Sequence, residues 1–355
     1  MPAKDGELMK GEMEFHPPLR SSLVIIHHCC NKSSSVGHHL TPCSRLPPSA
    51  HLFIGFLACS LPSLLTFSGL IDALASQNAE NRCKIAMRYP QLHGKDLKAV
   101  IKSECGGDFG TALQFLSVPT HEMECDMIQR ACQGLGTNEL ILYPVICGRT
   151  NEEINILKKK FYDVTGKDLG RVLDAELGGD LEKLIFNCLQ GAEEEFDPAF
   201  HDDSLVKQDV ETIYKAGQGS FGTNESGFFK VLVARPSEHL KTVNLAYAEK
   251  YGYTLFKALE TEIGGQTGEA ALFMLGMKLR PYETIAKLIK KACAGIGTNE
   301  LLLTCCLVRY QPHLKHAMEA YIELYTQSIQ DDVKKELRGD FEKLLLQVCA
   351  AAREN

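Results

Sequence analysis

The feature that most constrains this chain is an internal repeat built from two short words. The first word, Gly-x-Gly-Thr-Asn-Glu, occurs in ACQGLGTNE (131–139) and ACAGIGTNE (292–300), with a relative, GQGSFGTNE, at 217–225. The second word reads SECGGD, AELGGD, TEIGGQ and KELRGD, and it follows each copy of the first by about forty residues. Because the second word occurs four times, the chain holds four units of roughly 70 to 85 residues each.

The units have the periodicity of α-helices. After two of the second words, apolar residues recur with one-sided helical spacing, and strand alternation is scarce. These apolar positions are Leu181, Leu184, Ile185, Cys188 and Leu189, and Phe341, Leu344, Leu345, Val348 and Cys349. We therefore expect an all-α fold.

Short polar side chains mark the expected helix starts. We expect Asp180 and Asp340 to cap the helices that follow the second word, and Thr137, Thr223 and Thr298 to cap those that follow the first. The glycine-rich loop then joins two helices. A P-loop or a dinucleotide fingerprint would follow a strand, so this context argues against both.

Composition limits the partners. The 355 residues carry a formal net charge of -7, which provides no basic field for nucleic acid, so an anionic partner needs a bridging cation. The fourteen cysteines lack a disulfide framework spacing and fall largely at apolar helix positions. That usage is typical of reduced, buried thiols in a cytosolic protein.

Each glycine-rich loop is followed by a glutamate at a nearly constant distance. Counted from the second glycine of each loop, Glu176 and Glu262 lie 40 residues further on and Glu336 lies 39 further on. Calcium takes about six to eight oxygens, so loop carbonyls with one carboxylate leave positions for water or a lipid phosphate. For one loop, turn glycines and an exposed glutamate are the simpler interpretation. Three coupled copies favour calcium.

From about Ser68 to the C-terminus the sequence resembles an annexin, on the strength of the loops, the spaced glutamates, the second word and the helical periods in this order. The resemblance implies an all-α array of four repeats, about five helices each, forming a curved disc with the calcium loops on the membrane-facing side. The first repeat is incomplete. We expect a leader at 1–66, repeats at 67–118, 119–192, 205–278 and 279–355, and an acidic linker at 193–204.

The resemblance also implies three calcium sites. The expected ligands are the carbonyls of Cys132, Gly134 and Gly136 with Glu176; those of Gly217, Ser220 and Gly222 with Glu262; and those of Cys293, Gly295 and Gly297 with Glu336. Leu135, Phe221 and Ile296 stand between the loop glycines, where they are expected either to contact the membrane or to fold back on their own repeat.

This chain departs from the family pattern at several places. The lysine usual before the first glycine is Gln133 in the second repeat and Ala294 in the fourth, which is expected to weaken lipid contact. In the first repeat, SLLTFS around Leu64 stands where the loop should be. We expect no calcium site there and a Glu104 without a partner, with apolar surface exposed unless His51 to Phe67 replaces the missing helix.

The leader differs in composition from the rest. No secretory signal opens it, and no charge occurs from Leu46 to Ile71, a length that could span a bilayer although Pro62 and several serines weaken it. Histidines and cysteines between His27 and Cys43 lack paired zinc spacing. An atypical or disordered leader is the favoured interpretation over an anchor or a zinc site.

Between the second and third repeats, the acidic segment GAEEEFDPAFHDD is interpreted as a solvated linker.

These observations predict a cytoplasmic protein that binds anionic phospholipid membranes peripherally when calcium rises. We expect no nucleic-acid partner, and a protein partner is a possibility that the resemblance places in the leader. An enzyme is not expected, because no nucleophile elbow, zinc-protease motif or locally spaced Cys/His pair occurs. The alternative is a helical scaffold that works through protein partners without calcium.

Overall fold

The computed structural model describes residues 67–134, 136–217, 225–294 and 297–354. These residues form helices and no strands, which confirms the all-α expectation. The helices of the first repeat are α3 (Phe67–Leu70), the π-helical turn η2 (Ile71–Ala75), α4 (Ala79–His93), α5 (Leu97–Glu104) and α6 (Gly107–Leu116). Those of the second are α7 (Thr120–Ala131), α8 (Glu139–Ile146), α9 (Asn151–Thr165), α10 (Leu169–Asp174) and α11 (Gly179–Leu189).

The third and fourth repeats follow the same order. The helices of the third are α12 (Asp203–Ala216), α13 (Glu225–Ala234), α14 (Ser237–Tyr251), α15 (Leu255–Glu262) and α16 (Gly265–Leu279). Those of the fourth are α17 (Pro281–Ala292), α18 (Glu300–Arg309), the 3-10 turn η3 (Gln311–His313), α19 (Leu314–Tyr325), α20 (Ile329–Glu336) and α21 (Gly339–Glu354).

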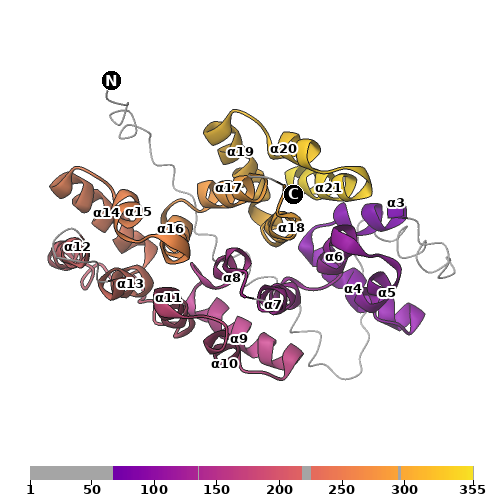
Figure 1. Ribbon diagram of the computed structural model, residues 1–355, viewed down its shortest axis with the longest axis horizontal. Coiled ribbons are helices and arrows are strands. Elements are labelled where there is room, and N and C mark those ends of the chain that lie inside the picture. The colour runs from indigo at the N-terminus through magenta and orange to yellow at the C-terminus, as the bar shows by residue number, and fades with distance from the viewer. Residues whose placement is uncertain (1–66, 135, 218–224, 295–296, 355) are drawn as a thin grey trace.

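The repeats pack as two pairs (Figure 1). In one pair α11 packs on α13 and α16 on α8, which joins the second and third repeats. In the other, α6 packs on α18 and α21 on η2, so the first repeat lies beside the last. The apolar stripes predicted after the second word are buried in this core, apart from the partly exposed Phe341. Nine of the ten described cysteines are buried and Cys132 is half-buried, as expected.

The sequence Gly-Lys-Asp-Leu occurs at 94–97 and again at 166–169, and both copies form the same turn between two helices. Gly94 and Gly166 end α4 and α9 in the left-handed conformation, and the aspartate two residues later caps the next helix. In the fourth repeat the same turn contains Thr326, with φ of 56°. A β-branched residue is strained in this region of backbone space.

The expectation that Asp180 and Asp340 cap their helices is wrong. Gly179 and Gly339, both with positive φ, already begin α11 and α21, so each aspartate lies one residue inside the first turn. There Asp180 forms an ion pair of 2.8 Å with a lysine three residues on. In both repeats a positive-φ glycine therefore starts the helix, and the aspartate after it contributes a negative charge near the helix N-terminus.

A buried charge cluster joins the second repeat to the fourth. The Glu124 side chain of α7 is 0% exposed, and its Oε1 accepts a hydrogen bond of 2.8 Å from Arg309 Nε of α18 and another from Arg149. Burial alone would raise the pKa of Glu124, but the two guanidinium groups outweigh it and hold this pKa well below its usual range. Glu124 is therefore ionised and paired in the core.

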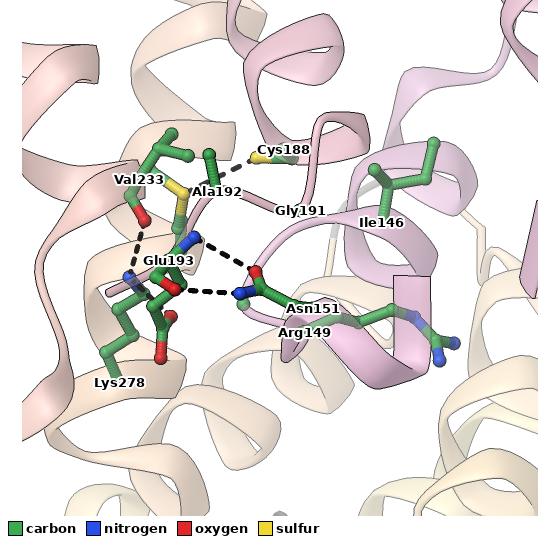
Figure 2. A pocket seen from close by; sticks show the side chains of 11 residues that line it. Ile146, Arg149, Asn151, Cys188, Gly191, Ala192, Glu193, Val233 and Lys278 are labelled. Carbon is green, nitrogen blue, oxygen red and sulfur yellow. Dashed lines mark hydrogen bonds and ion pairs between the residues drawn. The ribbon is translucent and has the colours of Figure 1, made fainter. Parts of the chain in front are cut away.

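The segment between α11 and α12 is attached to the third repeat, and the prediction of a solvated linker is wrong for its first carboxylates. Figure 2 shows Glu193 beside Asn151 and Lys278. The Glu193 carboxylate lies 2.8 Å from Lys278 Nζ, and its backbone bonds Asn151 at 2.9 and 2.7 Å. A neighbouring cavity of about 20 Å³, lined in part by Cys188, has room for one water.

Candidate calcium sites

The first glycine-rich loop joins α7 to α8 and is closed by a backbone hydrogen bond of 2.8 Å from Asn138 N to Ala131 O. Gly134 and Gly136 have φ of 109° and 89°. No atom lies within 4 Å of a Cβ built on either, so their requirement for glycine is conformational rather than steric. Leu135 lies outside the described residues.

The distant glutamate lies at this loop. Thr137 Oγ1 donates to the backbone carbonyl of Glu176 at 2.9 Å and lies 3.3 Å from its carboxylate Oε2. The structure thus brings together two positions that the sequence connects only by spacing. The expectation that Thr137 caps a helix is wrong, because Asn138 occupies the N-cap of α8.

The fourth repeat has the same arrangement. Asn299 N closes the loop on Ala292 O at 2.9 Å, and Gly297 has φ of 91°. Thr298 Oγ1 donates a hydrogen bond of 2.9 Å to Glu336 Oε2. Asn299, and not Thr298, caps α18 by accepting from Leu302 N. Gly295 and Ile296 lie outside the described residues.

Lys335 contacts the second oxygen of the fourth-repeat carboxylate. Its exposed ammonium lies 3.4 Å from Glu336 Oε1. A cation in this loop would share that oxygen with the lysine, whose long side chain is free to move into solvent.

The third loop is described only at its ends. Gly217 ends α12, and a Cβ built on it would lie 2.7 Å from Cγ of Glu262 and 3.2 Å from its Oε2. Glycine is therefore required here to let the glutamate approach the loop backbone. Ser220, Phe221, Gly222 and Thr223 lie outside the described residues.

The two loop cysteines carry neutral thiols. Burial, with Glu176 nearby, raises the pKa of Cys132 to about 11. Burial, with Asp332 and Glu336 nearby, raises that of Cys293 to about 12. Since a thiolate and not a thiol binds metals, these residues could serve a cation only through their backbone carbonyls. The residues described contain no group of three His, Cys, Asp or Glu side chains suited to a metal.

In the first repeat, the glutamate that corresponds to Glu176 and Glu336 is Glu104, and it contacts no loop residue among those described. Glu104 ends α5 and is exposed, and its side chain forms no hydrogen bond or ion pair with any described residue. The segment around Leu64 that would supply its loop lies outside the described residues. The absence of a calcium site in this repeat remains a prediction.

Sequence reasoning missed the contacts of Thr137 and Thr298 with the glutamates. The signal was present, because a threonine follows the second glycine in all three loops at a nearly constant distance from a glutamate.

A search of the described helices finds none with both the length and the apolarity to cross a bilayer.

Comparison with known proteins gives consistent matches. A family model described as Annexin matches residues 68–116, 123–187, 208–274 and 285–348. Annexin A13 of Mus musculus is 32% identical over 281 residues, covering 79% of this chain and 88% of the mouse protein. Annexin A7 of Dictyostelium discoideum is 31% identical over 282 residues, covering 79% of this chain and 60% of that protein. The solved structure of annexin III gives a TM-score of 0.78 at 25% identity, covering 88% of this chain and 98% of that one.

Proposed function

Because this chain belongs to the annexin family, we propose that it binds anionic phospholipid membrane surfaces through calcium held at three of its loops. Annexins in general bind phospholipid membranes in a calcium-dependent manner and are not enzymes. The observation that carries the finer proposal is the contact between loop threonine and distant glutamate in two repeats.

The donor chemistry fits a hard cation. Positive-φ glycines allow a loop to turn its carbonyl oxygens outward, and the glutamate adds a carboxylate at the loop edge. The proposed ligands are the carbonyls of residues 132, 134 and 136 with Glu176, of 217, 220 and 222 with Glu262, and of 293, 295 and 297 with Glu336. When bound, calcium would supply the positive charge that joins these oxygens to a lipid phosphate.

The chain's own residues prepare the sites. The loop threonines orient the carboxylates of Glu176 and Glu336 toward the loops, so fewer side-chain conformations are lost on binding. Gly217 leaves room for Glu262 to do the same. Leu135, Phe221 and Ile296 are proposed to add apolar contact with the bilayer interface.

Calorimetric titration with calcium alone tests the three sites. Glu176→Gln, Glu262→Gln and Glu336→Gln should each remove one binding site, because each deletes a charged ligand while keeping side-chain size. Glu104→Gln is the matched control and should change nothing. Absence of calcium binding in the wild type, or identical titrations for all variants, would favour the scaffold that acts through protein partners.

A further inference from the structure

The segment between α11 and α12 exposes two phenylalanines. Phe196 is 45% exposed and Phe200 is 53% exposed. Both rings pack on the buried imidazole of His201, Phe196 stacked with a centroid separation of 5.4 Å and Phe200 edge-on at 5.0 Å. We call the two rings, together with the exposed acidic residues next to them in the segment, Glu195, Asp197, Asp202 and Asp203, the linker aromatic patch.

The imidazole of His201, on which both rings pack, is held by a network of hydrogen bonds and ion pairs. His201 Nε2 lies 3.1 Å from Glu194 Oε2, and Arg235 holds the same carboxylate at 2.7 Å. Arg235 also holds Asp209, which bonds His239 at 2.9 Å, and the two imidazoles lie 5.0 Å apart. The rings are therefore held in place before any partner arrives, which lowers the entropy cost of binding.

The backbone of this segment is also held. Phe200 N and His201 N donate to Asp197 O at 3.1 and 2.8 Å, and Glu194 N donates to Ala234 O at 2.8 Å. These bonds close a turn in which both Phe196 and Phe200 contact the imidazole of His201. The exposure of the two rings is thus a property of a folded turn.

The rim of the patch carries four carboxylates, two of which accept backbone hydrogen bonds, Asp197 from Ala199 N and Asp202 from Leu205 N. Within the described part of the chain, no ion pair involves Glu195, Asp197, Asp202 or Asp203. No lysine or arginine occurs between Gln190 and Val206. A partner that covers the rings and also neutralises the rim must be both apolar and basic.

The patch lies away from the candidate calcium loops. α11 begins three residues after Glu176 and runs for 11 residues, or about 16 Å, before the segment starts. α12 then runs for 14 residues, or about 21 Å, from the segment to Gly217. Both helices are seen nearly end-on in Figure 1, so the segment and the loops lie toward opposite faces.

We infer that the linker aromatic patch docks a basic amphipathic helix of a partner protein. The apolar stripe of such a helix would cover Phe196 and Phe200, and its lysines or arginines would meet the carboxylate rim. Two anchoring rings are a small contact, so the complex is weak and exchanges rapidly. The site is independent of the calcium loops and would stay accessible with those loops on a membrane.

The test uses a fluorescent synthetic helix of leucine and lysine, titrated with the full chain in the presence of chelator and followed by anisotropy. Phe196→Ser combined with Phe200→Ser should weaken binding about tenfold, and Glu195→Lys combined with Asp203→Lys should weaken it similarly. Tyr162→Ser, which removes another exposed ring (60% exposed) on α9, is the matched control and should bind like the wild type. Thermal melting checks that each variant folds.

Equal binding by all variants would overturn the proposal, because attraction to an acidic protein in general would then explain it. Equal binding of a helix with glutamate in place of lysine would overturn it as well. Two other occupants have distinct outcomes that also contradict it. A wild-type dimer that the double serine variant abolishes in sedimentation would indicate a second copy. If the leader of this chain occupied the patch, the peptide would bind only after two of the leader's basic residues were reversed in charge, Arg20→Glu and Lys32→Glu.

Discussion

Thr298 Oγ1 donates a hydrogen bond of 2.9 Å to Glu336 Oε2, which joins the glycine-rich loop of the fourth repeat to a carboxylate at the end of α20. In the second repeat Thr137 Oγ1 lies 3.3 Å from Glu176 Oε2 and donates a shorter bond of 2.9 Å to the Glu176 backbone carbonyl. The glutamates lie about forty residues after their loops in the sequence, and these hydrogen bonds hold each carboxylate beside its loop in the folded protein.

Replacing Thr298 by valine should weaken calcium binding at the fourth repeat about tenfold, because Glu336 would lose the donor that orients it. Calorimetric titration of calcium measures this effect. Thr212→Val is the matched control, since that exposed hydroxyl bonds only its own helix. An unchanged affinity in Thr298→Val would show that the threonine does not position the carboxylate.

Replacing Glu124 by glutamine should lower the free energy of unfolding by about 3 to 5 kcal/mol, because two buried guanidinium groups would lose their shared carboxylate. Urea unfolding at neutral pH measures the change. Glu122→Gln on the same helix removes a half-exposed pair with Lys160 and should cost about 1 kcal/mol or less. Similar losses for the two variants would contradict the account of this cluster.

The pH dependence of stability should carry a contribution from His313. Burial, and then the charge of Arg309, lowers its pKa from 6.5 to about 4 in the folded protein. Between these values the unfolded chain binds more protons than the folded one, so stability falls as pH drops from 6.5 toward 4. From pH 7 to pH 5 this one group removes about 2 kcal/mol.

His313→Gln should therefore lose about 2 kcal/mol less than the wild type over the same change of pH. Urea unfolding at both pH values provides the comparison. His316→Gln, at an exposed site, should follow the wild type. Burial also lowers the pKa of His239, so a loss of the same sign remains in the His313 variant.

Replacing Thr326 by glycine should raise the free energy of unfolding by about 1 kcal/mol, because a β-branched residue with φ of 56° is strained. Thermal unfolding measures this gain. The reverse change at the equivalent turn, Gly166→Thr, should destabilise by a similar or larger amount. A loss of stability in Thr326→Gly would mean that the Thr326 side chain contributes more than its strain costs.

The helices and the pairing of loop with glutamate could be predicted because both repeat within the sequence. The role of Thr298 could not, since a hydroxyl before Asn-Glu fits a helix cap as well as a carboxylate contact. Only the approach of Glu336 decides between them. Likewise, nothing local to Glu124 indicates Arg309, because the two meet across the repeat pairs.

The linker shows the same limit. Its acidic run is typical of a solvated segment, yet Glu193 and Glu194 pair with Lys278 and Arg235, which the third repeat supplies. The acidic charge of the segment can be predicted from its sequence. That Lys278 and Arg235 lie beside it cannot, because their positions depend on how the repeats pack.

The most direct test of the central claim is co-sedimentation with vesicles containing phosphatidylserine, with calcium and with chelator. The wild type is compared with a variant carrying Glu176→Gln, Glu262→Gln and Glu336→Gln. Calcium-dependent binding by the wild type and its loss in the variant is the predicted result. Binding that persists in chelator, or that the triple variant retains in full, would contradict the proposal that calcium at these loops joins the protein to the membrane.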